Sequence, residues 1–320
     1  MKKIVTFLVC LLPLFAFCGE PLMLIKPSRE IFVNFPSAVL PDKAVSVFLP
    51  EPSIPLHQKY PVVYMLGVVP TDFAQAQNVL AKAGQKAIIV GINVTEEDLA
   101  ATDKISRFFS QELVPYIDSN YLTKDQPAER VLAVKGAAGE KAAGVLVTQK
   151  KLMNRVVVLH GGENAPAWKS LPAQSRILVA GNQAEVAAWS QYLQENQKQV
   201  YGPGFVTRLT TENSLFDVLD LDYLFAPAEE LELVKLTGTI TPSSVSISTK
   251  EKAELKISAL LVNGTRFDFV PVALKMAPPF LEWNSASGVL IPLPGATAGK
   301  VKISTIVDNT PFTGVLKLKK

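Results

Sequence analysis

Hydrophobic residues in the first two-thirds of the chain fall into two kinds of segment, which alternate. Short runs of consecutive apolar residues, typical of strands buried on both faces, lie at residues 45–49, 62–66, 87–94, 131–134, 156–159 and 177–180. Between them, apolar residues recur every three or four positions, which predicts helices at residues 72–83, 105–120, 185–196 and 214–225. Strands alternating with helices predict an α/β domain over residues 22–226, a mostly parallel sheet with helices on both faces.

The pattern changes after a predicted linker at residues 227–232. From residue 233 onward, apolar and polar positions alternate with a period of two in several short segments. Turn signals stand between these segments at Asn263-Gly264, Ser287-Gly288 and Pro294-Gly295. Residues 233–320 are therefore predicted to form an all-β sandwich.

The N-terminus has the features of an export signal. Lys2 and Lys3 precede an apolar run at residues 4–17, which is shorter than the roughly 20 residues that a membrane-spanning helix needs. We expect a signal peptide at residues 1–18 and a periplasmic, extracellular or surface-attached protein. Three fates of this segment are open: cleavage after Cys18, lipidation of Cys18, and retention as an anchor. The mature chain is expected to have no transmembrane segment, because no other stretch is long and apolar enough.

The amino-acid composition excludes several classes of protein and of binding site. Of the 320 residues, 48% are hydrophobic and 19% are charged, which is typical of a folded protein of about two domains. The formal charge of +3 argues against a nucleic-acid-binding protein. Cys10 and Cys18 are the only cysteines and precede both domains, so neither domain can hold a disulfide or a thiolate metal site. We expect no metal and no other cofactor.

Three stretches of the α/β domain carry a family resemblance. They are residues 59–66 (KYPVVYML), 108–123 (FFSQELVPYIDSNYLT) and 131–144 (VLAVKGAAGEKAAG). In this order they resemble the esterase D-like family of α/β-hydrolases, over most of residues 30–225. The resemblance implies an α/β-hydrolase fold, a His-Gly oxyanion turn after the first stretch, and a nucleophilic serine on the elbow in the third.

The chain departs from this family at each catalytic position. Ala137, between small neighbours at Gly136 and Ala138, stands at the nucleophile position and has no Oγ to form an acyl-enzyme. The oxyanion turn reads Gly67-Val68, and no acid directly follows the strand at 177–180, where Glu185 is the nearest. The base position holds Asn213, which cannot accept and return a proton near pH 7.

The number and position of the histidines also argue against a complete catalytic triad. The chain contains only His57 and His160, so the hydrolase order of Ser, Asp and His cannot be completed after residue 160. His160-Gly161-Gly162 resembles the oxyanion loop of lipases, but it follows the elbow instead of preceding it. A tight turn at a strand end and a contact to a ligand are the two other interpretations.

The C-terminal region carries its own resemblance. Residues 239–261, the Asn263-Gly264 turn, residues 281–283 and residues 300–305 resemble a bacterial immunoglobulin-like domain. This resemblance implies a spacer or adhesion module without catalysis, with Trp283 in its core.

Three functions are open. The first is an exported, non-catalytic, esterase-like protein that acts as a binding or scaffolding module in the cell envelope. The second is an active ester hydrolase with an unorthodox site at His160 or Ser214. The third is a purely structural or adhesive envelope protein. The expected partner is an envelope glycan, peptide or protein, and the candidate ligand-binding residues are Gly136, Ala137, Ala138, His160, Trp168 and Asn213.

Overall fold

The structure is a computed structural model, in which residues 29–50, 58–68, 72–84, 87–149, 152–162, 168, 171–172, 174–197 and 202–320 are described. The predicted signal peptide at residues 1–18 and His57 lie outside the described residues.

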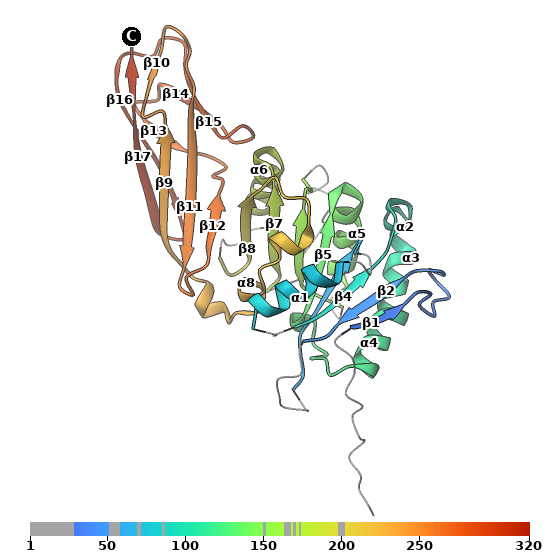
Figure 1. The fold of residues 1–320 in the computed structure, drawn as a ribbon. Helices are drawn as coiled ribbons and strands as arrows, with labels where there is room; N and C mark the ends of the chain where they lie inside the picture. Colours follow the sequence, from blue (N-terminus) through green and yellow to red (C-terminus); the bar gives the residue numbers. More distant parts are fainter. Residues whose placement is uncertain are drawn as a thin grey trace, which may run out of the picture.

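The α/β part is built on a mostly parallel sheet (Figure 1). Its strands are β1 (Arg29–Phe32), β2 (Val45–Phe48), β3 (Val62–Leu66), β4 (Ile88–Ile92), β5 (Arg130–Lys135), β6 (Arg155–Leu159), β7 (Arg176–Gly181) and β8 (Phe205–Leu209). They lie in the order β1-β2-β4-β3-β5-β6-β7-β8, with β1 and β2 antiparallel to their neighbours and all others parallel. Strands β3, β4, β6 and β7 are buried along their whole length, which explains their continuous apolar runs.

Helices cover both faces of this sheet (Figure 1). They are α1 (Phe73–Lys82), α2 (Glu96–Ala100), α3 (Thr102–Arg107), α4 (Val114–Asn120), α5 (Gly136–Thr148), α6 (Gln183–Tyr192), α7 (Leu215–Val218) and α8 (Leu221–Phe225). Helix α1 packs against α7, while α2 and α3 pack against α5. In the part of the chain that the structure describes, no helix is both long enough and apolar enough to span a membrane. The predicted α/β-hydrolase-like fold class is confirmed.

The helix predicted at residues 105–120 is interrupted in the middle. A π-helical segment, Phe108–Leu113, joins α3 to α4. Pro115 lies in the first turn of α4 and has no N–H to donate to a carbonyl one turn earlier, so the regular hydrogen-bond pattern cannot pass through it. Phe108 and Phe109 are nevertheless fully buried, as their helical spacing predicted.

The C-terminal part consists of two facing sheets, as the period of two predicted. Its strands are β9 (Leu233–Thr241), β10 (Ser244–Ser246), β11 (Ala253–Leu261), β12 (Arg266–Phe269), β13 (Lys275–Ala277), β14 (Leu281–Asn284), β15 (Val289–Pro292), β16 (Gly299–Val307) and β17 (Thr310–Lys319). One sheet contains β9, β12, β11, β15 and β14, and the other has the order β10-β17-β16-β13. Trp283 is half-buried at the margin of the core, and its Nε1 donates a hydrogen bond of 2.9 Å to the carbonyl of Pro271.

The two parts are joined by strand pairing and hydrogen bonds as well as by the polypeptide chain. Strand β8 pairs with β12 through Thr207 and Asp268, so the main sheet continues into the C-terminal part. The backbone N–H of Leu209 donates a 2.7 Å hydrogen bond to the Asp268 carboxylate. The segment predicted as a linker contains a short 3-10 helix, Ala228–Leu231, and Leu231 is fully buried. The connection is therefore a packed junction.

Candidate functional site

The carboxyl ends of the parallel strands form one edge of the sheet, where α/β proteins commonly place their sites. Four of these ends turn sharply. Gly67 follows β3 with φ +82°, Gly136 follows β5 with φ +70°, and His160 follows β6 with φ +52°. Asn182 follows β7 and caps α6 by accepting hydrogen bonds from the backbone N–H groups of the first turn.

The turn from β5 into α5 has the sharp strand-to-helix geometry of a nucleophile elbow. Gly136 is the residue with positive φ, and a Cβ built on it would meet no atom within 4 Å. Three residues later, a Cβ on Gly139 would lie 3.0 Å from Cβ of Val134, so this glycine allows α5 to lie close to the strand. The small residues of this segment thus produce the close turn, while none of them carries a hydroxyl or thiol.

His160 is held by both of its ring nitrogens. Its Nδ1 lies 3.1 Å from Oε2 of Glu185, and its Nε2 lies 2.7 Å from the backbone carbonyl oxygen of Glu212. Glu185 also accepts a 2.8 Å hydrogen bond from the backbone N–H of Asn182, which fixes the carboxylate at the start of α6. Glu185, the acid nearest to the end of β7 in the sequence, therefore contacts the histidine.

The loop that follows β8 lies across the ends of β5 and β6. The carbonyl of Glu212 faces His160, and the carbonyl of Asn213 accepts a 2.9 Å hydrogen bond from Nζ of Lys135. The next residue, Ser214, accepts a hydrogen bond from the backbone N–H of Phe216 at 3.3 Å and donates to Oε1 of Gln75 at 3.0 Å. Two backbone carbonyls thus bind the side chains at the strand ends, and the Ser214 hydroxyl has a structural role in capping α7.

A depression of about 430 Å³ opens beside His160. It is lined by Ala137, His160, Gly161, Gly162, Asn182, Ala184, Glu185 and Ala188. We call it the remnant cleft. None of these eight residues has a hydroxyl or a thiol, so the described lining of the cleft contains no Ser, Thr, Tyr or Cys nucleophile. Ala137 and His160 are the predicted candidates that line it; Gly67, Gly136, Ala138 and Asn213 do not.

Trp168, a candidate ligand-binding residue in the sequence, lies in the core of the structure. Its side chain is 1% exposed and packs edge-on against Trp189 at a ring-centroid distance of 4.8 Å. Its Nε1 donates a 3.1 Å hydrogen bond to the backbone carbonyl of Glu140. Gly144 on α5 makes room for the indole, because a Cβ there would lie 2.8 Å from the ring. Trp168 is therefore a core residue and cannot stack on a ligand in this conformation.

Glu140 is a buried carboxylate that the sequence did not mark as important for the site. It is fully buried on α5, and its Oε2 accepts a 3.1 Å hydrogen bond from the backbone N–H of Gly162. It therefore holds the Gly161-Gly162 turn against α5, next to His160. The only indication of this role in the sequence was an acid at a position where the elbow pattern has a small residue.

The described residues contain no group of three or more His, Cys, Asp or Glu side chains that could hold a metal ion. His160 and Glu185 form a pair without a third such ligand.

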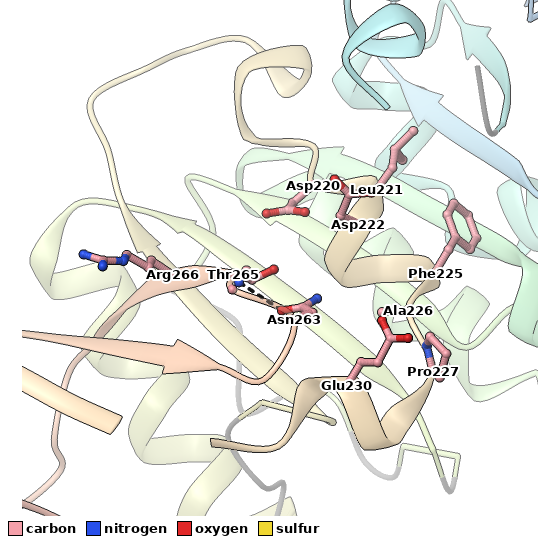
Figure 2. A pocket seen from close by; sticks show the side chains of 11 residues that line it. Asp220, Leu221, Asp222, Phe225, Ala226, Pro227, Glu230, Asn263, Thr265 and Arg266 are labelled. Carbon is pink, nitrogen blue, oxygen red and sulfur yellow. Dashed lines mark hydrogen bonds between the residues drawn. The ribbon is translucent and has the colours of Figure 1, made fainter. Parts of the chain in front are cut away.

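A second, larger hollow of about 580 Å³ lies at the junction of the two parts (Figure 2). Figure 2 shows Leu221 and Phe225 on one side and the Asn263–Thr265 turn on the other. Asp220 in its wall is 3.1 Å from Nη2 of Arg208 and also caps α8, and Asn263 Oδ1 accepts a 2.9 Å bond from the Thr265 N–H. These polar groups stabilise the junction itself.

No protein-family model matches this sequence, and no curated protein matches it. Solved structures do match. An IroE-like serine hydrolase from Shewanella oneidensis is 19% identical with a TM-score of 0.47, over 59% of this chain and 78% of that chain. Enterochelin esterase from Shigella flexneri is 16% identical with a TM-score of 0.43, over 59% and 54%. A ferulic acid esterase from the anaerobic fungus Anaeromyces mucronatus is 18% identical with a TM-score of 0.41, over 57% and 81%. The likeness concerns the overall fold, and the chemistry of the cleft rests on its own residues.

Proposed function

We propose that this protein is an exported, non-catalytic, esterase-like protein that acts as a binding or scaffolding module in the cell envelope. The observation that carries the proposal is the absence of a nucleophile at the turn after β5. An elbow places its nucleophile on the strained residue of the turn, and here the residue with positive φ is Gly136. Gly136 thus fits the nucleophile position better than Ala137, and neither residue can form an acyl-enzyme.

The arrangement of His160 also supports the loss of catalysis. A general base needs a free nitrogen directed at the proton that it removes. In His160, Nδ1 faces Glu185 and Nε2 faces the Glu212 carbonyl, so neither nitrogen points into open space. An unorthodox hydrolase centred on His160 would first have to displace the loop after β8.

The remnant cleft is the part of the α/β domain that we propose for ligand binding. Its polar groups are His160, Asn182 and Glu185, and its volume suits a small part of a glycan or peptide. The export signal predicted at residues 1–18 supports an envelope partner.

Ester hydrolysis tests the catalytic half of the proposal. Residues 19–320 would be incubated with p-nitrophenyl acetate and butyrate, beside the variants Gly136→Ser and Ala137→Ser. We expect the unmodified protein to give no turnover above solvent hydrolysis. Turnover that scales with protein concentration and disappears in His160→Ala would overturn the proposal in favour of an active hydrolase.

Binding tests the other half. Ala188 is half-buried in the cleft wall, and Ala188→Leu would fill the cleft, while Ala81→Leu adds the same bulk to an exposed position on α1. We expect soluble peptidoglycan fragments or envelope peptides to bind the Ala81→Leu control and the unmodified protein, and to bind Ala188→Leu more than tenfold more weakly. Equal affinity of all three proteins would remove the cleft from the proposal.

A further inference from the structure

The outer face of the four-stranded sheet β10-β17-β16-β13 carries a cluster of lysines. Its members are Lys275 on β13, Lys300 and Lys302 on β16, and Lys317 and Lys319 on β17, and all five are exposed. We call it the lysine face. Residues of the opposite parity on the same strands, such as Val301 and Leu316, are buried between the two sheets. The alternation along each strand therefore turns all five lysines to one side.

The strand register places these lysines beside one another. Lys300 lies directly opposite Lys317, and Lys302 pairs with Val315 on β17 and with Ala277 on β13. Neighbouring strands are about 4.8 Å apart, and alternate residues on a strand are about 7 Å apart. The positive charges thus form a compact two-dimensional array.

None of these five lysines forms an ion pair with a residue that the structure describes. Strands β10, β13, β16 and β17 contain no Asp or Glu. Residues 202–320 are described without a gap. The ion pair found within the C-terminal part joins Lys256 to Glu254, both on β11 of the other sheet, and does not involve the lysine face. Like charges directly opposite on neighbouring strands repel, as Lys300 and Lys317 do. Such an array favours an anionic partner.

The composition of the face indicates which kind of anionic partner it would bind. Val315 is 51% exposed and lies among the lysines, and no arginine is present in these strands. Lysine is a point charge suited to mobile anions, whereas arginine is favoured for stereospecific phosphate recognition. Clustered basic residues beside exposed aliphatic ones favour binding to anionic lipid headgroups.

We propose that the lysine face docks on a bilayer that contains anionic phospholipids, with Val315 entering the headgroup layer. The aliphatic stems of the lysines would lie along the surface while their ammonium groups reach the phosphates. Strands β16 and β17 lie along the side of the molecule furthest from α5 (Figure 1), so a docked molecule would direct its α/β part and the remnant cleft away from the membrane.

Vesicle sedimentation tests this proposal. Residues 19–320, which lack both cysteines and hence any lipid, would be mixed with vesicles of phosphatidylglycerol and phosphatidylcholine or of phosphatidylcholine alone. We expect binding to the anionic vesicles only, falling steeply as salt is added. The variant Lys300→Gln/Lys302→Gln/Lys317→Gln is expected to bind about 100-fold more weakly, at about fivefold for each lysine. The control Lys235→Gln/Lys252→Gln/Lys256→Gln removes equal charge from other surfaces of the same sandwich and is expected to bind several-fold more weakly at most.

Three further measurements complete the test. Thermal unfolding of each variant shows whether it is folded, and Lys300→Arg/Lys317→Arg should retain vesicle binding because it keeps the charge. Val315→Ser should weaken vesicle binding severalfold. The proposal would be overturned if the two triple variants lost vesicle binding equally, or if the unmodified protein bound anionic and uncharged vesicles equally well. Tight binding to soluble polyphosphate without vesicle binding would also overturn it and identify an anionic polymer as the partner.

Discussion

His160 adopts a backbone conformation that costs free energy for any residue with a Cβ. Its φ of +52° lies in the left-handed region, and its side chain offsets this cost through contacts to Glu185 and the Glu212 carbonyl. The imidazolium form can donate to both oxygens, whereas the neutral form can donate to one. The residue therefore fixes the end of β6 against α6 and the loop after β8.

We predict that His160→Ala lowers the free energy of unfolding by about 1–3 kcal/mol, because it removes both contacts and keeps the strain. His160→Gly should cost about 1 kcal/mol less than His160→Ala, since glycine adopts this φ without strain. Urea unfolding of the two variants measures both values. A larger loss for glycine than for alanine would contradict the strained conformation.

Tyr64 is a buried residue whose hydroxyl has no hydrogen-bond partner among the described residues. It lies on β3, and its ring packs edge-on against Phe109 at 5.6 Å. Burial raises the pKa of the Tyr64 hydroxyl well above its usual value of 10.0, and the nearby Asp118 carboxylate adds to this rise. The neutral tyrosine is therefore strongly preferred in the folded state.

We predict that Tyr64→Phe leaves stability nearly unchanged at pH 7 and raises it relative to the unmodified protein above pH 10. A group whose folded pKa is raised supports folding fully below its unfolded pKa, and this support is lost as pH rises from about 10 toward the folded value. Tyr121→Phe is the contrasting control, because the Tyr121 hydroxyl donates a 2.6 Å hydrogen bond to Glu30 and its loss should cost about 1 kcal/mol at pH 7. Urea midpoints at pH 7 and pH 11 measure the effect, and a large loss at pH 7 for Tyr64→Phe would contradict it.

At the scale of elements, the pairing of β8 with β12 holds the two parts together. Asp268 contributes two hydrogen bonds to this pairing: its carboxylate accepts from the Leu209 N–H at 2.7 Å, and its carbonyl accepts from the Thr207 hydroxyl. Thr207 is fully buried, so its polar atom needs this partner.

We predict that Asp268→Ala speeds hydrogen exchange at the Leu209 amide at least tenfold and lowers the free energy of unfolding by about 1–3 kcal/mol. Glu282→Ala on β14 removes the same charge at the far edge of this sheet and should change neither value. Protection of Leu209 that is unaffected by Asp268→Ala would show that the strand pairing does not depend on this carboxylate.

Strands β2 to β7 were predictable because a strand buried on both faces needs a continuous apolar run, as in β4 and β6. Strands β1 and β8, at the two ends of the α/β part of the sheet, were not predicted. The ends of the helices were harder to predict. The predicted helix at 214–225 is in fact two short helices, α7 and α8, which are capped by the side chains of Ser214 and Asp220 respectively. The junction between the parts could not be predicted. One bridge between Thr207 and Asp268 leaves no periodic signal in the sequence.

The candidate site was predictable only in part. Ala137 and His160 could be placed because strand order brings their strand ends to one edge. The roles of the Glu212 and Asn213 carbonyls could not be predicted, because every residue has a backbone carbonyl and the sequence does not show which of them bind a side chain. The burial of Trp168 could not be predicted, because it depends on Gly144, a glycine inside a helix that leaves room for the indole.

At the scale of the whole molecule, the continuous sheet and the buried Leu231 make the two parts one mechanical unit. Leu231 is fully buried, and its carbonyl lies where a side chain on Gly202 would have to be. The C-terminal part therefore extends the α/β part as a fixed arm, which suits a scaffolding module and would hold the lysine face at a set distance from the cleft.

We predict that both parts unfold together. Hydrogen exchange followed by mass spectrometry at rising urea concentrations should show protection lost at one common midpoint in β3–β7 and in β11–β17. Leu231→Ala should lower the free energy of unfolding by about 2–5 kcal/mol. Separate midpoints in the unmodified protein would mean that the junction does not couple the two parts.

The most direct measurement is covalent labelling with a fluorophosphonate, which reacts with activated serine nucleophiles. The intact mass of residues 19–320 would be recorded after incubation with excess reagent, with an active serine esterase as the positive control. The missing hydroxyl at Gly136 and Ala137 predicts an unchanged mass for this protein and complete labelling of the control. A stoichiometric adduct that His160→Ala abolishes would contradict the loss of catalysis and show that this fold retains a working hydrolase site.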